Sequence, residues 1–260
     1  MDYWKKQTRD KPLFENILWS RPETKHGAGK LLVIGGNSFG FSSVQEAYKS
    51  ASDAGAGTIR TVLPESLHKI LGGLLDNTIF APSTPSGSFA NDALGEFLIN
   101  SEWSDGVILS GDLGRNSETS ILLEKYLDKY DGQLTIAKDS IDYFYNQPKL
   151  VLHRLNTCLV LNLSQLQKLG TASNFDTPFL IGMGLVLLVQ ALHKFTLENE
   201  SIIITKELDN IVVAYKGMVS STKIDSREED AWRTEVGTQA SVFWMQSPSK
   251  PFESITTSLV

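Results

Sequence analysis

Short apolar runs alternate along this 260-residue chain with longer segments in which apolar residues recur at helical spacing. Runs that are apolar at nearly every position are typical of parallel strands covered on both faces. The pattern therefore predicts an α/β fold with a central, mostly parallel sheet of at least six strands. The predicted strands are Lys30–Ile34, Thr58–Leu63, Gly106–Leu109, Leu134–Ala137, Thr157–Leu161 and Ser201–Thr205.

Helices long enough to cross such a sheet are predicted between the strands. They cover Ser42–Ala54, Pro64–Leu75, Ala90–Ile99, Glu118–Lys129, Leu163–Leu169, Phe179–Leu197 and, last, Gly237–Gln246. Two later runs, Ile211–Ala214 and Met218–Thr222, are joined by Tyr215–Gly217 and predict an antiparallel hairpin. Since no linker divides the chain, we expect one domain over residues 1–260, with residues 1–25 as an N-terminal extension.

Composition narrows the possible partners and location. Thirty acidic and 24 basic side chains give a net charge of −6, so we expect neither nucleic acid nor a membrane surface as a partner. The longest apolar stretch, Phe179–Leu192, is interrupted by Gln190 and falls short of the roughly 20 residues that span a bilayer. The N-terminus is too charged for a secretory signal, and the single cysteine, Cys158, cannot form an internal disulfide. These features predict a soluble, cytoplasmic protein.

Glycine and polar residues follow three of the predicted strands. Gly35–Asn37 follows the first, Asp112 lies in a glycine-rich junction after the third, and Lys138, Asp139 and Asp142 follow the fourth. Ligands of open α/β sheets bind at the carboxyl ends of strands, so these junctions predict a crevice, although the glycines alone are also compatible with a tight structural turn. The sequence contains no dinucleotide fingerprint, no P-loop and no His or Cys spacing typical of a metal site.

Four motifs occur in an order found in one family. They are K-H-x-x-G-K-L-L-V-I-G-G-N from Lys25, A-G-A-G-T from Ala54, V-I-L-S-G-D-L-G-R from Val107 and K-D-S-I-D from Lys138. With this order the chain resembles the ATP/ADP-dependent NAD(P)H-hydrate dehydratases, which have a ribokinase-like fold and repair hydrated nicotinamide cofactors. About a third of the chain carries the resemblance, mainly residues 26–65 and 106–142.

The resemblance implies a three-layer α/β/α architecture, ATP or ADP with Mg as cofactors, hydrated NAD(P)H as substrate, and a homo-oligomer. It also implies a set of binding residues. The substrate-binding positions are Gly36, Asn37, Ser42, Ser43, Asp112, Gly114, Asp139 and Asn162, and the nucleotide-binding positions are Lys206, Asn210 and Arg233.

The C-terminal half departs from the family pattern. The family's G-S-G-D motif, which supplies an anion hole and a general base, falls at Ala231–Thr234, so that Thr234 occupies the aspartate position. Asp230 and Glu235 are the nearby carboxylates that could replace it, and the family's T-P-H-P-G-E is replaced by Val160–Gln165. Two functions follow: a working dehydratase (a lyase), or a pseudoenzyme that has lost catalysis and binds nucleotides or acts as a scaffold.

Overall fold

The computed structural model describes residues 1–71, 77–224 and 232–260 of the chain. In these residues ten strands form a single sheet. The strands are β1 (Trp4–Gln7), β2 (Lys30–Gly35), β3 (Thr58–Pro64), β4 (Thr78–Ala81), β5 (Gly106–Gly111), β6 (Leu134–Ala137), β7 (Thr157–Leu161), β8 (Ile202–Glu207), β9 (Asn210–Tyr215) and β10 (Met218–Lys223).

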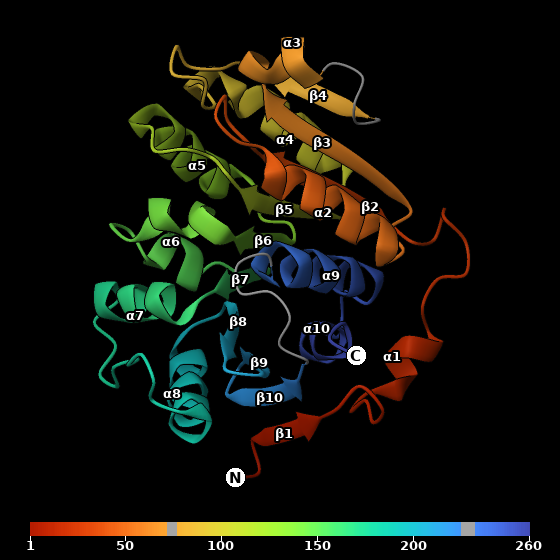
Figure 1. Cartoon of the computed structure of the whole chain (residues 1–260), viewed down its shortest axis with the longest axis vertical. Helices are drawn as coiled ribbons and strands as arrows, with labels where there is room; N and C mark the ends of the chain where they lie inside the picture. The colour runs from red at the N-terminus through yellow and green to blue at the C-terminus, as the bar shows by residue number, and fades with distance from the viewer. Residues whose placement is uncertain (72–76, 225–231) are drawn as a thin grey trace.

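The order of the strands across the sheet is β1-β10-β9-β8-β7-β6-β5-β2-β3-β4. Neighbouring strands from β4 to β8 are parallel, β8 to β10 run antiparallel to one another, and β1 is parallel to β10. The prediction of a mostly parallel sheet of at least six strands is therefore confirmed (Figure 1).

Helices cover both faces of the sheet. They are α1 (Glu15–Trp19), α2 (Ser42–Asp53), α3 (His68–Leu71), α4 (Leu94–Trp103), α5 (Ser117–Lys129), α6 (Lys149–Leu152), α7 (Leu163–Ala172), α8 (Leu185–Glu198), α9 (Trp232–Gln246) and α10 (Pro251–Thr257), with 3₁₀ helices η1 (Glu65–Leu67), η2 (Asn91–Ala93) and η3 (Lys138–Phe144). Helices α2, α9 and α10 pack on one face, and α4, α5, α7 and α8 pack on the other (Figure 1). The predicted three layers are present.

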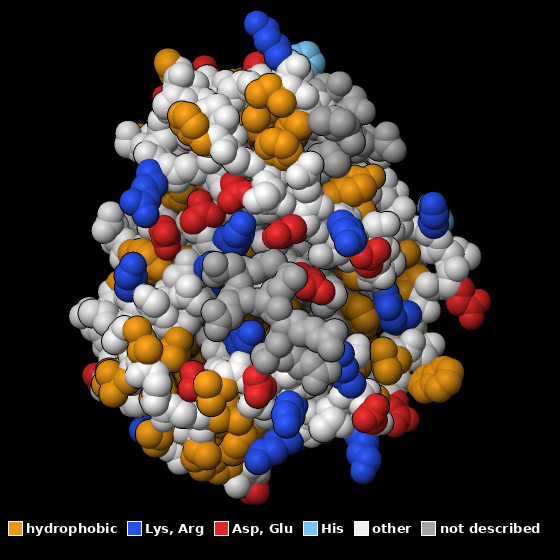
Figure 2. Space-filling view, in the orientation of Figure 1, with side chains coloured by type: hydrophobic (Ala, Val, Ile, Leu, Met, Phe, Trp, Pro, Cys, Tyr) orange, Lys and Arg blue, Asp and Glu red, His pale blue; other side chains and the backbone are white. Residues whose placement is uncertain are grey.

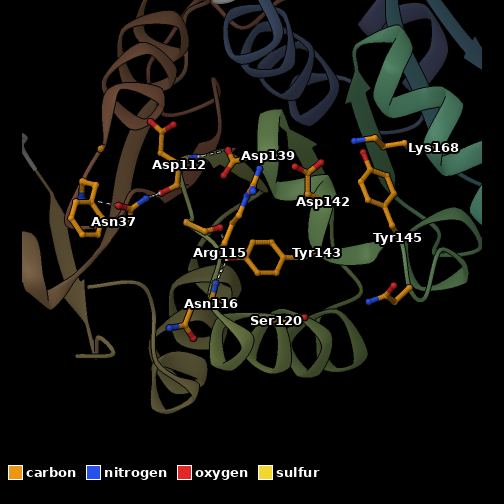
Figure 3. Close-up of a pocket in the computed structure, with 14 residues that line it drawn as sticks. Asn37, Asp112, Arg115, Asn116, Ser120, Asp139, Asp142, Tyr143, Tyr145 and Lys168 are labelled. Atoms are coloured by element: carbon orange, nitrogen blue, oxygen red, sulfur yellow. Dashed lines mark hydrogen bonds between the residues drawn. The ribbon is translucent and has the colours of Figure 1, made fainter. Parts of the chain in front are cut away.

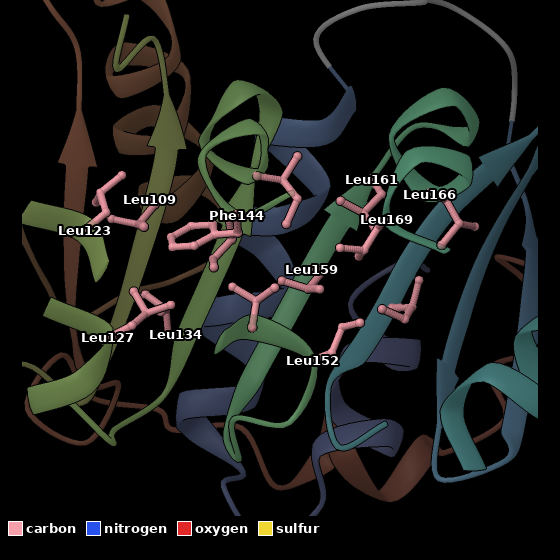
Figure 4. Close-up of a cluster of buried hydrophobic side chains, with 14 of the residues drawn as sticks. Leu109, Leu123, Leu127, Leu134, Phe144, Leu152, Leu159, Leu161, Leu166 and Leu169 are labelled. Atoms are coloured by element: carbon pink, nitrogen blue, oxygen red, sulfur yellow. The ribbon is translucent and has the colours of Figure 1, made fainter. Parts of the chain in front are cut away.

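The core follows from the alternation of side chains along each strand. Leu31 and Val33 of β2 point into the cluster that contains α2, whereas Leu32 and Ile34 point into the cluster on the opposite face. In that second cluster Leu109 and Leu134 lie close to the leucines of α5 (Figure 4). Because both faces of the strand are buried, the strands are apolar at consecutive positions, which is why the sequence predicted them well.

Three predicted helices differ clearly from those observed. The helix predicted over Phe179–Leu197 begins only at Leu185, because Gly182 and Gly184 have φ of 77° and 76°, values outside the helical region. The helix predicted over Pro64–Leu75 is η1 followed by the single turn of α3, and residues 72–75 lie outside the described residues. The last long helix begins at Trp232 rather than at Gly237.

The predicted hairpin is confirmed, with Tyr215 paired to Met218. Lys216 and Gly217 between them have φ of 46° and 76°, the positive values that a tight two-residue hairpin turn requires. The predicted N-terminal extension also contributes a strand, since Trp4 of β1 pairs with Val219 of β10. Strand β4, at the opposite edge of the sheet, was not predicted.

The surface of the molecule mixes both signs of charge. On the face shown in Figure 2, basic and acidic side chains are interspersed rather than gathered into fields of one sign. Across the three described stretches of the chain, no helix has both the length and the apolar character required to cross a membrane.

Candidate functional site

The order of the strands reverses between β2 and β5. From β2 the chain proceeds outward through β3 and β4 and then returns to place β5 on the other side of β2. Open α/β sheets bind ligands at such a switch point, beyond the carboxyl ends of the strands. The loops that leave β2, β5, β6 and β7 at this edge therefore define the candidate site.

Three of these loops are joined by hydrogen bonds. The N–H of Gly36 donates to the carbonyl of Gly111 at 3.0 Å, and Nδ2 of Asn37 donates to the carbonyl of Asp112 at 2.5 Å. The N–H of Asp112 then donates to Oδ1 of Asp139 at 2.7 Å. The junctions that the sequence predicted to meet at one edge of the sheet do meet there.

The backbone at these junctions is in an unusual conformation. Gly111 has φ of 111°, and a Cβ atom there would lie 2.7 Å from Cβ of Lys138 and 2.8 Å from Oδ1 of Asp139. Asp112 and Lys138 occupy the left-handed region with φ of 57° and 53°, although neither is glycine. Such conformations cost on the order of 1–3 kcal/mol each and cluster at functional sites. The strain therefore supports a functional role for this edge.

Asp112 is held as an ionised carboxylate. Its Oδ2 accepts hydrogen bonds from the N–H of Ser43 at 2.8 Å and from Oγ of Ser42 at 3.2 Å, and its Oδ1 lies 3.4 Å from Nζ of Lys138. Burial by itself would raise the pKa of Asp112, but the N–H of Ser43 and the charge of Lys138 outweigh it, so that the pKa is lowered.

Asp139 has the opposite electrostatic character. Burial raises the pKa of its carboxyl group, and the negative charge of Asp112 acts in the same direction, whereas the hydrogen bond from Asp112 N–H opposes them without cancelling them. Two neighbouring carboxyl groups whose pKa values are displaced in opposite directions are typical of acid–base sites. Asp139 is therefore a candidate for proton transfer.

A pocket of about 760 Å³, here called the first pocket, opens beside these residues. Figure 3 shows Asp139 and Asp142 between Asp112 on one side and Lys168 on the other. The lining residues are Asn37, Phe39, Gly40, Asp112, Gly114, Arg115, Asn116, Ser120, Asp139, Asp142, Tyr143, Tyr145, Asn146 and Lys168.

Phe39 stands out at the rim of the first pocket because 91% of its surface is exposed. It is carried by a turn in which the N–H of Asn37 donates to the carbonyl of Gly40 at 2.8 Å and the N–H of Gly40 donates back at 3.1 Å. The N–H of Phe39 itself donates to Oδ1 of Asn37 at 2.7 Å. The turn thus holds an aromatic ring in solvent at the mouth of the pocket.

A second pocket of about 430 Å³ adjoins the first. The two share Asp112, Asp139, Asp142 and Lys168, so they form one continuous crevice. The lining residues of the second pocket are Asp112, Lys138, Asp139, Asp142, Asn162, Ser164, Gln165, Lys168 and Arg233.

The residues predicted to bind substrate are divided in the structure. Asn37, Asp112, Gly114, Asp139 and Asn162 line the crevice. The remaining three are Gly36, Ser42 and Ser43, which line neither pocket: Gly36 is bonded to the end of β5, and the two serines contact Asp112.

The residues predicted to bind the nucleotide are divided too. Arg233 lines the second pocket. Lys206 and Asn210 lie at the same edge of the sheet, at the turn between β8 and β9, but line neither pocket.

The position of the expected general base is filled by packing. Thr234 is fully buried near the start of α9 and carries no carboxylate, whereas Glu235 is exposed and lines neither pocket. Asp230 lies outside the described residues. The described residues therefore present no carboxylate at the position where the family has its aspartate.

Sequence reasoning missed side chains that reach the crevice from helices. Lys168 of α7 and the aromatic rings of Tyr143 and Tyr145 were not predicted, because none of them directly follows a predicted strand. The spacing offered one usable signal: Lys168 follows Ser164 by four residues, which places both on the same side of a helix.

The described residues contain no group of three or more His, Cys, Asp or Glu side chains that could hold a metal ion. Magnesium usually binds through one or two carboxylates together with substrate phosphates. Asp142, whose carboxylate lies 3.4 Å from Nε2 of Gln165, is exposed and fits the carboxylate part of that requirement. A magnesium ion that accompanies a nucleotide stays a prediction.

Comparisons with known proteins identify the fold. No protein-family model and no curated protein matches the chain. Among solved structures, a ribokinase-like superfamily protein from Enterococcus faecalis is 16% identical with a TM-score of 0.73, over 99% of this chain and 85% of its own. A hypothetical protein from Streptococcus mutans is 14% identical with a TM-score of 0.69, over 93% and 84%.

A third solved structure, the ADP/ATP-dependent NAD(P)H-hydrate dehydratase from Bacillus subtilis, was co-crystallised with ATP and Mg²⁺. It is 11% identical with a TM-score of 0.63, over 95% of this chain and 85% of its own. At these identities the likeness concerns the fold, and the chain has a ribokinase-like α/β fold.

Proposed function

We propose that this protein of ribokinase-like fold binds a nucleotide in the crevice formed by the first and second pockets. The observation that carries the proposal is the continuity of the two pockets at the topological switch point, where they share Asp112, Asp139, Asp142 and Lys168. The solved dehydratase of similar fold was crystallised with ATP and Mg²⁺, which supports the class of ligand.

The two pockets differ in a way that suits the two ends of a nucleotide. The first pocket has an exposed ring, Phe39, at its rim and a second ring, Tyr143, in its wall, and aromatic side chains stack on heterocyclic bases. The second pocket contains the cations Lys138, Lys168 and Arg233, which attract phosphate. We therefore place the base in the first pocket and the phosphates in the second.

A second candidate function is the dehydration of hydrated NAD(P)H at the expense of ATP or ADP. The observation that favours it is the pair of carboxyl groups in the crevice, with the pKa of Asp112 lowered and that of Asp139 raised, chiefly by burial. In this reading Asp139 accepts the proton of the substrate hydroxyl as its oxygen takes the terminal phosphate of ATP and ADP leaves. The phosphorylated oxygen then departs as inorganic phosphate, together with a proton of the ring. Asp139 would replace a base at the position of Thr234, which carries no ionisable group.

Thermal unfolding with ligands tests the binding proposal. A ligand present at 100 times its Kd stabilises the folded protein by about 2.7 kcal/mol. For a chain of this length that corresponds to a rise in Tm on the order of 5–10 °C. ATP, ADP, AMP and NADPH should be compared with adenosine. A Tm that none of these ligands raises would contradict nucleotide binding.

Turnover separates the two candidates once binding has been measured. Loss of hydrated NADPH in the presence of ATP or ADP, followed by its absorbance, would support dehydration. An unchanged rate in the Asp139→Asn variant would exclude Asp139 as the proton acceptor. Binding without turnover would leave a nucleotide-binding pseudoenzyme. Self-association and a cytoplasmic location stay predictions.

A further inference from the structure

Gln165 connects three separate elements beneath the second pocket. Its Nε2 donates to the carbonyl of Lys138 at the end of β6, at 2.7 Å, and its Oε1 accepts from Nη1 of Arg233 in α9, at 2.8 Å. Its own N–H and Oε1 form a capping box with Asn162 at the start of α7. Only 8% of the side chain of Gln165 is exposed. A buried amide with all these partners fixes the orientation of the arginine.

Arg233 has donors that no described residue engages. Among the described residues, Gln165 is the hydrogen-bond partner of its guanidinium and takes Nη1 alone, and Arg233 lines the second pocket. A guanidinium has a rigid fork of donors that matches the oxygens of phosphate. An arginine that is anchored at one nitrogen loses less side-chain freedom when a ligand binds than a mobile one.

The other two cations of the second pocket, Lys138 and Lys168, differ in whether a carboxylate pairs with them. Lys138 lies 3.4 Å from Oδ1 of Asp112 and balances that carboxylate. Lys168 is exposed, lies 5.9 Å from the ring centre of Tyr145, and pairs with no carboxylate of a described residue. Among the described residues, Lys168 and Arg233 are therefore the cations of the second pocket that pair with no carboxylate.

The carboxylates of the second pocket have hydrogen-bond partners within the protein. Asp112 already accepts from Ser43 N–H and Lys138, so its charge is compensated within the protein. Asp139 accepts from Asp112 N–H at 2.7 Å. Asp142 is exposed to solvent, and its Oδ1 accepts from Nε2 of Gln165 at 3.4 Å. Each of these three carboxylates thus has a hydrogen-bond donor within the protein, whereas no carboxylate of a described residue pairs with Lys168 or Arg233.

We propose that Arg233 and Lys168 clamp a phosphate group of the nucleotide in the second pocket, and that Gln165 is the positioning residue that aims Arg233. This inference rests on the proposed function and specifies which residues receive the phosphate. The side chain of Arg233 would thereby perform the task that backbone N–H groups perform in a glycine-rich anion hole, at a place where this chain has Trp232 and Arg233 in place of glycines.

Isothermal titration of the full chain with ADP, adenosine and inorganic pyrophosphate tests the clamp. The double variant Arg233→Gln/Lys168→Gln should weaken ADP and pyrophosphate binding roughly tenfold to a hundredfold, because charge-assisted hydrogen bonds are lost. Adenosine binding should be unchanged. Lys129→Gln, which removes a cation at the opposite edge of the sheet, is the matched control and should change neither.

The role of Gln165 has a separate readout. Gln165→Met should lower ADP affinity selectively, and Gln165→Glu should lower it further because it adds a negative charge beside the phosphate. A merely structural role would lower ADP and adenosine affinity together, and that result would overturn the positioning role.

The outcomes distinguish the clamp from the proposed function. An ADP preference over adenosine that survives in the double variant would overturn the clamp while nucleotide binding stands. If neither ADP nor adenosine binds the natural protein, the proposed function fails, and pyrophosphate alone then decides the clamp. Pyrophosphate that binds and is lost in the double variant supports it, and pyrophosphate that does not bind, or binds both proteins equally, overturns it.

Discussion

Two charged hollows at opposite edges of the sheet contain arginines in contrasting surroundings. At the amino-terminal edge a pocket of about 310 Å³ surrounds Arg154, whose guanidinium donates to the carbonyls of Tyr130, Gly132, Leu155 and Asn156 and to Oγ1 of Thr157. At the carboxyl edge the guanidinium of Arg233 has a single hydrogen bond, to Gln165, among the described residues.

The difference shows how to tell a structural charge from a charge available for binding. The donors of Arg154 are taken up by main-chain carbonyls, so the residue fastens the end of α5 to the start of β7. The guanidinium of Arg233 is anchored at one nitrogen, and no other described residue accepts a hydrogen bond from it. Both places have a pocket and an arginine. The two arginines differ in how many of their N–H donors already have an acceptor among the described residues.

Removal of Arg154 should have the largest effect on stability. Arg154→Ala leaves several carbonyls without donors, and we expect the free energy of unfolding to fall by about 3 kcal/mol. The Arg233→Ala variant should lose less than about 1 kcal/mol, because one hydrogen bond to a side chain is removed. Urea denaturation measures both. Equal losses in the two variants would break the comparison.

The exposed ring of Phe39 should matter for the ligand and not for the fold. With 91% of its surface exposed, its replacement in Phe39→Ala should change the free energy of unfolding by less than about 0.5 kcal/mol. Loss of stacking should weaken nucleotide binding by about 1–2 kcal/mol, or roughly tenfold. Titration with ADP measures the affinity. Unchanged affinity would remove Phe39 from the base-binding surface, and Phe39→Trp, which keeps a ring, should retain affinity.

Asp139 and Asp112 should respond to pH in opposite directions. Because the pKa of Asp139 is raised by burial, the folded state binds its proton more tightly, and this contribution to stability is lost as pH rises from about 4 through the folded pKa. Asp139→Asn does not titrate, so it should gain on the order of 1 kcal/mol relative to the natural protein between pH 4 and pH 7.

Asp112→Asn is the matched control for that comparison. The pKa of Asp112 is lowered because the Ser43 N–H and Lys138 outweigh the effect of burial, so its contribution to stability is present at neutral pH and lost as pH falls. Asp112→Asn should therefore be less stable than the natural protein at pH 7, with a gap that closes in acid. Urea denaturation at several pH values checks both variants, and parallel pH curves would refute the assignment.

The sequence predicted most of the sheet and the part of the site that depends on topology. Strands such as Thr157–Leu161 are recognisable because both of their faces are buried, and Asn37, Asp112 and Asp139 follow strands whose carboxyl ends must share one edge. These inferences need no knowledge of how the helices are oriented.

The remaining features depend on tertiary contacts. The short strand Trp4–Gln7 has a single apolar residue, Trp4, and so shows no strand pattern of its own. It is stabilised by its pairing with β10, a partner distant in sequence. Lys168 and Gln165 reach the second pocket only because α7 packs at a particular angle beside β7. Neither the position of that helix nor the contact of Gln165 with Arg233 is encoded in a local pattern.

The pairing of β1 with β10 has a consequence for biosynthesis. Residues 4–7 are synthesised more than 200 positions before their partners in the register Trp4↔Val219 to Gln7↔Thr222. During translation β1 therefore stays unpaired until β10 has been synthesised. Long-range pairing of this kind is slow. A truncation that removes residues 4–7 would leave that edge of β10 unpaired and open to pairing with another molecule.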